Sequence, residues 1–534
     1  MDLDTQWSAA SFEVKAGRDP LGLQTITTDR IMPVLIPGIL ALSQRARYLS
    51  FHLFALDEYA RRRLPADRGS LSDFVRRLEY DLALATQICP KGCGELSGVG
   101  SVGRNSVSRE RDEDGPFKPA FSVKSPLGGY GLYYRSPLLS MGLVAREGTP
   151  MGGESGTPTP IDVIDSDLGI EIADAFRARV EDTEYYRRYL NTPDARPRAV
   201  LLEYSERACL CGLDESPAER ALLRRALFET RAPMPPEGPA QRRRSFAFWL
   251  ELLKRNAAVE VDGSAFRHAV WERFLEDGMS GSGDERSNTM AAWAALVARE
   301  ALQECWSSIW ADFCREGLER QGPYGLDPDE LPRLVEELLA RPVDLPNGSQ
   351  LTIEPTEAVA ALISRAKREL GPVELEELRV WVEGEDSLAA GVLGMLLMRD
   401  QMPTVEAMPA GWDVVGGEDG ASQPGLLRLL ASIEAMLSAD DTVGGFARHF
   451  VDRFVVEAHE RVAYAKLPEF TFRFRWSDGR LRFFEKTMTG RFTPGDIRQG
   501  SLEWLSFDIG LYEGTGDTLR VTRQGEALIA EAFG

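Results

Sequence analysis

The stretches Met141-Gly142-Leu143-Val144 and Gly169-Ile170-Glu171-Ile172 have counterparts at the C-terminus, Ile509-Gly510-Leu511-Tyr512 and Gly525-Glu526-Ala527-Leu528. In both places a short helix ends in a Gly-Leu pair, a polar stretch follows, and a second glycine opens an amphipathic helix. The first glycine suits the left-handed cap that ends a helix, and the polar stretch suits a hairpin. The repeat predicts one small helix–hairpin–helix unit in each half of the chain.

This order of elements is typical of winged-helix domains, in which the hairpin forms the wing. Such domains mostly bind DNA or other proteins and are not usually catalytic. We therefore expect two winged-helix-like modules, one within residues 120–192 and one within residues 425–534, in a protein that serves recognition.

Composition indicates an ordinary globular protein. The 534 residues are 43% hydrophobic and 27% charged, and this length predicts several domains. The chain opens with Asp2 and Asp4 in place of a basic leader, and the apolar stretch 31–42 is too short for a bilayer span. Six cysteines make no disulfide framework in so long a chain. We expect a cytoplasmic protein without a membrane partner.

Helical periodicity dominates the chain and predicts a mainly α fold with small β elements. The segment 39–63 is apolar around nearly its whole circumference, so we expect it to be a buried central helix. The segment 289–316 also has helical periodicity. The predicted parts are an N-terminal helical domain (1–119), the first winged-helix-like module (120–192), a helical middle region (193–408), a linker (409–424) and a C-terminal part with helices, a β-hairpin and the second module (425–534).

The clearest strand signal flanks Asp478-Gly479, where aromatic residues alternate with Thr and Arg. Alternation predicts the aromatics on the inner face and Arg473 and Arg475 on the solvent face. The segment 461–500 holds nine Lys/Arg against four Asp/Glu in a chain of net charge −21. Clustered guanidinium groups suit phosphate contacts, whereas outward arginines also protect exposed strand edges. The candidate nucleic-acid contacts are Arg473, Arg475, Arg480, Arg482, Lys486, Arg491 and Arg498.

Two cysteine pairs are candidate metal ligands. Cys89 and Cys93 have the spacing C-x-x-x-C, and Cys209 and Cys211 have the spacing C-x-C. Four thiolates would close a tetrahedral zinc site if the two segments met. Neither spacing is the C-x-x-C of zinc ribbons, so the sequence favours small buried residues with a partly exposed thiol. Zinc is the one cofactor that the sequence suggests.

Three further polar features have structural explanations. Arg45, Arg47 and His52 lie on the predicted buried helix, and we interpret them as a satisfied core network. His459 precedes the hairpin and is expected to orient that junction. The carboxylates between Asp162 and Glu171 suggest a metal, but they are explained more simply as the cap of the helix that begins near Gly169. A nuclease would also need a motif such as Glu13-Val14-Lys15, which has no clear partner carboxylate on an upstream strand.

Parts of both ends resemble a known class of protein. The segments 19–22, 35–39 and 45–51 (DPLG, LIPGI and RARYLSF) and the region from His459 to the C-terminus are similar to large uncharacterised proteins of bacterial antiviral (phage) defence loci. The resemblance implies a component of a multi-protein system, and it carries over no functional residues.

The leading hypothesis is a non-catalytic DNA-binding or adaptor subunit with other protein subunits as partners. The first module would serve assembly, and the more basic C-terminal one would contact duplex DNA. One alternative is a protein–protein scaffold for a basic partner enzyme, without nucleic-acid contact. A second is a metal-dependent nuclease with a degenerate motif.

Overall fold

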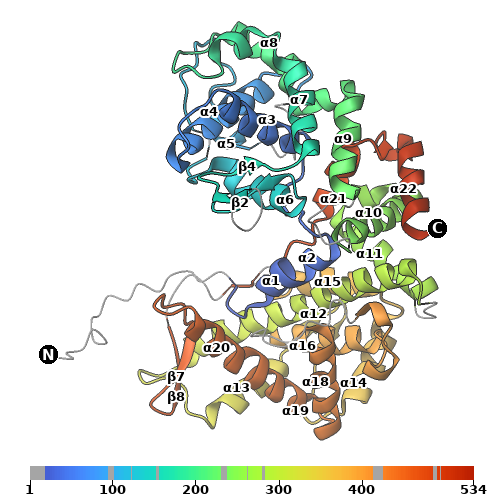
Figure 1. Ribbon diagram of the computed structural model, residues 1–534. Helices are drawn as coiled ribbons and strands as arrows, with labels where there is room; N and C mark the ends of the chain where they lie inside the picture. Colours follow the sequence, from blue (N-terminus) through green and yellow to red (C-terminus); the bar gives the residue numbers. More distant parts are fainter. Residues whose placement is uncertain are drawn as a thin grey trace, which may run out of the picture. The chain divides into compact units, whose positions relative to one another are not determined.

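The computed structural model describes residues 19–93, 102–121, 123–151, 156–229, 237–260, 262–278, 283–412, 425–484, 490–492 and 495–534 (Figure 1). Over these residues the chain is mainly helical, and its strands form two-stranded antiparallel sheets. The predicted fold class is therefore confirmed. None of the described helices has the length and apolarity that a bilayer crossing requires.

The chain divides into two compact units, each built from stretches that are distant in sequence. Unit 1 comprises Met1–Met32 and Gly263–Ile497, and unit 2 comprises Pro33–Asp262 and Arg498–Gly534. The short helix α2 (Met32–Leu35) contains the boundary between them.

Unit 1 is built around one long helix. Its elements are α1 (Leu23–Ile26), η2 (Thr27–Ile31), α11 (Gly263–Arg273), η7 (Phe274–Gly278), α12 (Glu285–Arg320), α13 (Glu330–Leu339), β5 (Val343–Asp344), β6 (Gln350–Leu351), α14 (Val359–Leu370), α15 (Leu375–Glu383), α16 (Leu388–Asp400), η8 (Val405–Ala407), η9 (Ala410–Trp412), α18 (Leu426–Ala439), α19 (Val443–Phe450), η10 (Val451–Val456), α20 (Glu457–Ala465), β7 (Phe474–Ser477) and β8 (Arg480–Phe483). Every residue of α12 from Thr289 to Cys314 is buried, so this helix is the core of the unit.

Helix α16 packs along α12 at very short range. A Cβ atom on Gly391 would lie 2.6 Å from the carbonyl oxygen of Cys305, which requires glycine at this crossing. Cys305 and Cys314 are buried in the same core.

The predicted hairpin is confirmed. Phe474 pairs with Phe483 and Trp476 with Leu481 across β7 and β8. Asp478 and Gly479 have φ values of 53° and 75°, which is the left-handed conformation that tight hairpin turns require at both central residues.

His459 orients the start of the hairpin, as the sequence predicts. Its Nε2 accepts a hydrogen bond from the Arg473 backbone N–H at 2.8 Å, and its Nδ1 lies 3.0 Å from the carbonyl oxygen of Pro20. The ring is 1% exposed, and burial lowers the pKa of His459 to about 4. The neutral ring therefore donates from Nδ1 and accepts at Nε2.

This burial makes a pH-dependent contribution to stability. The unfolded His459 binds a proton below its ordinary pKa of 6.5, whereas the folded one stays neutral down to about 4. Burial of the neutral ring therefore makes its full contribution to the free energy of unfolding above pH 6.5. This contribution, of the order of 3 kcal/mol, is lost as the pH falls toward 4. We expect the stability difference between wild type and His459→Gln to shrink between about pH 7 and about pH 4.5 in urea titrations. A difference that stays constant over this range would contradict the burial of a neutral ring.

Unit 2 contains the segments with the repeated pattern. Its elements are α3 (Arg47–Arg61), α4 (Arg68–Gln87), α5 (Arg104–Val107), η3 (Tyr130–Tyr134), α6 (Arg135–Ser140), β1 (Val144–Ala145), β2 (Pro150–Met151), β3 (Thr157–Pro158), β4 (Val163–Ile164), α7 (Asp167–Val180), η4 (Tyr185–Tyr189), α8 (Arg198–Ala208), η5 (Leu210–Glu215), α9 (Pro217–Phe228), α10 (Glu237–Arg255), η6 (Ala257–Glu260), α21 (Gln499–Asp508), β9 (Tyr512–Glu513), η11 (Gly516–Thr518), β10 (Arg520–Val521) and α22 (Arg523–Phe533). The predicted central helix corresponds to α3, which begins at Arg47 and is almost wholly buried.

The two copies of the pattern have the same local geometry. Each helix ends at a left-handed glycine, Gly142 with φ 62° or Gly510 with φ 75°. An antiparallel strand pair follows, β1 with β4 or β9 with β10, and in the first copy the further pair β2 with β3 lies between β1 and β4 in the sequence. A hydroxyl then caps the second helix: the Ser166 side chain accepts from the Gly169 N–H, and the Thr522 side chain accepts from the Gly525 N–H.

The second glycine of each copy is required by space. A Cβ atom on Gly169 would lie 3.0 Å from the carbonyl oxygen of Leu143, and one on Gly525 would lie 2.2 Å from that of Leu511. The short pattern in the sequence therefore encodes one helix–strand–strand–helix unit that occurs twice in unit 2.

Some polar groups at the start of α3 and just before it are paired within unit 2. Asp508 accepts hydrogen bonds from the Arg45 guanidinium at 2.9 Å and from the Ala46 N–H at 2.8 Å. The His52 ring stacks on Tyr48, and burial lowers the pKa of His52 to about 3. The prediction of a satisfied network is therefore wrong for His52, because neither ring nitrogen has a hydrogen-bond partner among the described residues and Nε2 lies 3.9 Å from Glu79 Oε1.

Candidate metal centre

The first cysteine pair lies just beyond the end of α4. Cys89 follows the last turn of this helix, and its carbonyl oxygen accepts a hydrogen bond from the Gly92 N–H at 3.0 Å. Gly92 has a φ of 74°, so the chain reverses there and Cys93 turns back toward Cys89. The five-residue loop thus brings its two thiols to the same side.

The second pair lies at the end of α8. Cys209 is the C-terminal cap of this helix, and Cys211 lies in the 3-10 helix η5. The carbonyl oxygen of Cys209 accepts from the Gly212 N–H at 2.8 Å, which closes a tight turn around the two cysteines. Helices α4 and α8 pack against each other, so both pairs meet at the same place in unit 2.

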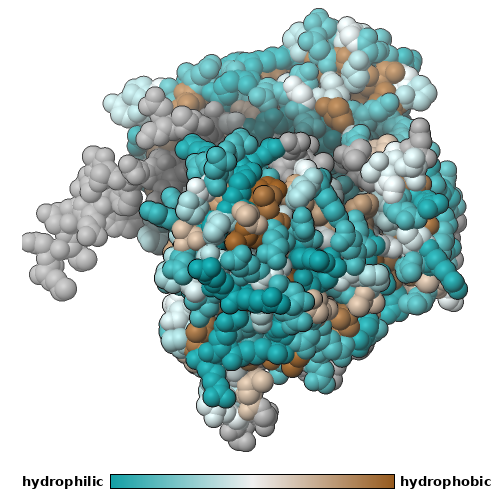
Figure 2. Space-filling model, turned by 90° about the horizontal axis from the view of Figure 1, so that it is seen from above, coloured by the Kyte–Doolittle hydropathy of each residue, from teal (hydrophilic) through white to brown (hydrophobic). Residues whose placement is uncertain are grey.

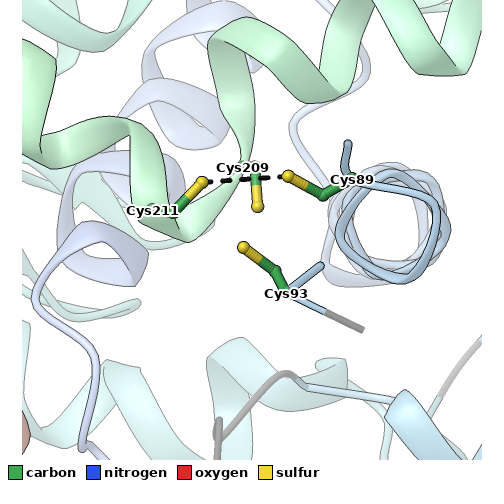
Figure 3. A group of neighbouring side chains, drawn as sticks. All are labelled: Cys89, Cys93, Cys209 and Cys211. Atoms are coloured by element: carbon green, nitrogen blue, oxygen red, sulfur yellow. Dashed lines mark hydrogen bonds between the residues drawn. The ribbon is translucent and has the colours of Figure 1, made fainter. Parts of the chain in front are cut away.

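The four sulfur atoms form one cluster (Figure 3). All lie within 4.8 Å of one another, and Cys89 Sγ is 3.8 Å from Cys211 Sγ. Zinc binds thiolates at about 2.3 Å, so the sulfur atoms of a tetrahedral site are about 3.8 Å apart. The geometry therefore fits a four-thiolate zinc site, and the competing interpretation, separate buried thiols, does not describe this arrangement.

The cluster is closed to solvent on most sides. Cys89, Cys93 and Cys209 are buried and Cys211 is half-buried, and all four are free thiols. Hydrogen bonds from the thiols of Cys209, Cys211 and Cys93 lower the pKa of Cys89, because they stabilise its thiolate. Among the described residues, this is the one group of three or more His, Cys, Asp or Glu side chains close enough to hold a metal ion.

A buried arginine supports the loop that carries Cys209. The Arg47 guanidinium donates to the carbonyl oxygens of Cys209 and Arg207, the latter at 2.8 Å. Its charge faces the carboxylate of Glu219 at 3.4 Å, and both side chains are fully buried. A Cβ atom on Gly212 would lie 2.2 Å from Arg47 Nη1, so glycine leaves the space that this guanidinium occupies.

Ion pairs between charged side chains also surround the sulfur cluster. Lys91, between the first two cysteines, forms a 2.5 Å ion pair with Glu215 at the end of η5. Arg179 of α7 contacts the same carboxylate at 3.1 Å. These pairs link the two cysteine-bearing loops outside the sulfur atoms.

The predicted basic residues near the C-terminus are not gathered on one exposed face. Arg473 is 7% exposed, contrary to the expected solvent face, because its strand is covered where its N–H bonds to His459. Arg480 pairs with Asp327 at 2.8 Å, and Arg475 is half-buried with its guanidinium over the Phe472 ring.

The other predicted basic residues are likewise dispersed. Arg491 donates to the carbonyl oxygens of Val382 and Glu385, and Arg498, which belongs to unit 2, donates to that of Ile39. Arg482 is exposed on β8. Lys486 lies outside the described residues.

The acidic segment before α7 has a structural role. Asp162 forms a 2.5 Å ion pair with Arg135 and accepts hydrogen bonds from Tyr130 Oη and the Glu147 N–H, both at 2.8 Å. The motif at residues 13–15 lies outside the described residues, as does most of the predicted linker.

No protein-family model, curated protein or solved structure matches this chain.

Proposed function

We propose that this chain is a non-catalytic adaptor subunit whose four-cysteine cluster binds one structural zinc ion. The cluster carries the proposal. Catalytic zinc sites keep one coordination position for water or substrate, whereas structural sites are closed by four protein ligands. Here Cys89, Cys93, Cys209 and Cys211 supply all four and leave no open position. In this arrangement the metal ties α4 to α8 and does no chemistry on a substrate.

Charge supports a protein partner rather than nucleic acid. The chain has a net charge of −21, and phosphate contact requires clustered Lys and Arg on a surface. Most of the candidate arginines are engaged with carboxylates, carbonyl oxygens or rings of this chain. The face in Figure 2 is largely hydrophilic, with hydrophobic residues in small separate groups. An acidic, polar exterior favours recognition of a basic partner.

A second candidate is nucleic-acid recognition by the two helix–strand–strand–helix units. Their shared geometry, with a left-handed glycine before the hairpin and a capped helix after it, favours winged-helix-like modules. The resemblance to antiviral defence proteins fits either candidate, because both describe one component of a multi-protein system.

One purification separates the two candidates. We expect the chain, isolated at low salt with its native neighbours, to carry a protein partner at fixed stoichiometry and no nucleic acid. The partner should dissociate as salt is raised, because screening weakens contacts between charged surfaces. The readouts are the ultraviolet absorbance ratio and the native mass, before and after nuclease treatment.

A charge-reversal variant provides the matched test. Arg475→Glu with Arg482→Glu changes the two hairpin arginines that reach solvent without an ion pair among the described residues. Duplex retention in a mobility shift that this variant abolishes would overturn the adaptor assignment and assign nucleic-acid contact to the β7–β8 hairpin of unit 1.

A further inference from the structure

A cavity of about 690 Å³ lies in unit 2 beside the second helix–strand–strand–helix unit. Helix α9 forms one wall with Arg220 and Arg224, and the turn after α21, β10 and the start of α22 form the other. Small-molecule sites are of the order of 300–1,000 Å³, so this cavity has the size of a drug- or nucleotide-sized ligand. All of its walls belong to the same unit.

The lining of the cavity is positively charged in a strongly acidic chain. It includes four arginines and two carboxylates. Asp214 pairs with Arg220, and Glu513 pairs with Arg520 at 2.7 Å. Among the described residues Arg224 and Arg523 face no carboxylate, which leaves two positive charges at the cavity without a counterion from the described chain.

Arg224 is held in this cavity at an energetic cost. Its Nη1 donates to the carbonyl oxygen of Ile509 at 2.6 Å, which fixes the guanidinium at the wall. Burial and the nearby charge of Arg220 lower the pKa of Arg224, so both effects disfavour the charge that arginine nevertheless keeps. A bound anion would attract the guanidinium and so offset both the loss of solvation and the repulsion from Arg220.

Two further features complete the site. Helix α22 begins at Arg523 on the cavity wall, and the first N–H groups of a helix favour an anion. The half-buried side chain of Phe507 also lines the cavity and adds an aromatic group to its wall. Cationic and aromatic groups thus line the same solvent-accessible pocket.

We propose that this cavity binds a phosphorylated small molecule of the nucleotide class, with Arg224 and Arg523 contacting its phosphate groups. Paired arginines match phosphate oxygens in geometry and charge. The cavity has room for a base as well as phosphate, and Phe507 lies in its wall. A nucleic-acid backbone would instead need a continuous basic surface, which the acidic exterior does not provide. This ligand site goes beyond the adaptor function and does not depend on the zinc ion.

Calorimetric titration of the full chain tests the proposal. The probes are inorganic pyrophosphate, ADP, ATP and a short single-stranded oligonucleotide with a 5′-phosphate. We expect saturable binding of pyrophosphate and tighter binding of ADP or ATP. Arg224→Gln should weaken the affinity about tenfold or more, the size of one lost charge-assisted contact.

Two further variants control for folding. Arg523→Gln changes an exposed side chain, so it should weaken binding without affecting the fold. Arg225→Gln removes the neighbouring arginine of α9, which pairs with Glu171 and Glu229 and does not line the cavity, and it should bind as wild type does.

Other outcomes would overturn the proposal. Absence of saturable binding of pyrophosphate and both nucleotides would do so, as would equal affinity in wild type, Arg224→Gln and Arg523→Gln. Tighter binding of the 5′-phosphorylated oligonucleotide than of ADP or ATP would reject the small molecule and assign the cavity to a nucleic-acid end.

Discussion

Replacing Cys209 with serine is expected to release the zinc ion and to lower the free energy of unfolding of unit 2 by roughly 4 kcal/mol, at the upper end of single-substitution effects. Cys209 is fully buried, and its loss leaves three thiols and a hydroxyl that binds zinc poorly. In the proposed site the metal would join the ends of α4 and α8, so its binding free energy would contribute to folding. The measurements are metal content by elemental mass spectrometry and unfolding in guanidinium chloride.

The matched control is Cys314→Ser. This cysteine is also fully buried, but it lies in α12 of unit 1, outside the sulfur cluster. It should retain a full complement of zinc even if it loses stability. Equal metal content in Cys209→Ser and Cys314→Ser would show that the cluster does not hold the metal.

Replacing Arg47 with methionine should cost about 3–5 kcal/mol, because it leaves the buried carboxylate of Glu219 without its cation. The substitution also removes the donor to the carbonyl oxygens of Cys209 and Arg207. The loop should then hold its two thiols less rigidly. We expect this variant to lose zinc to a competing chelator at least about tenfold faster than wild type does. This factor is in line with the effect of groups that orient metal ligands.

A second variant separates charge from positioning. Arg47→Met combined with Glu219→Leu replaces the ion pair with apolar side chains and should recover much of the lost stability. Zinc release should stay fast, because the carbonyl oxygens of the loop still lack their donor. If the double variant releases zinc as slowly as wild type, Arg47 acts on stability alone.

Local features of this chain were predictable because neighbouring residues determine them. The hairpin follows from alternation around Asp478-Gly479, and both residues adopt the left-handed conformation that the turn requires. The repeated helix–strand–strand–helix unit follows from its glycines, because Gly142 and Gly510 end helices in the left-handed region. The helical periodicity of residues 289–316 predicts a helix there, and α12 spans them.

Long-range features were not predictable in the same way. The cysteine pairs are separated by more than a hundred residues, and nothing in either spacing indicates that α4 and α8 end side by side. The role of Arg47 depends on the same packing, since its partners Cys209 and Glu219 are equally distant in sequence. The sequence shows only that Arg47 lies at the start of an apolar helix. This position predicts a buried polar network, but it does not identify the residues that pair with the arginine.

Alternation also failed where a strand is covered on both faces. It placed Arg473 outward, yet this side chain is buried because α20 lies against that part of the chain through His459. Period-two patterns distinguish an inner from an outer face only when one face meets solvent. The cavity could not be predicted either, because Arg224 and Arg523 belong to the two separate stretches of sequence that form unit 2.

Native mass spectrometry of the chain purified without chelator shows whether the four cysteines bind one zinc ion. We expect the mass of one zinc ion per chain and protection of Cys89, Cys93, Cys209 and Cys211 from thiol alkylation, with both lost after treatment with a strong chelator. A chain that carries no metal, and whose four thiols react equally with and without the chelator, would contradict this expectation.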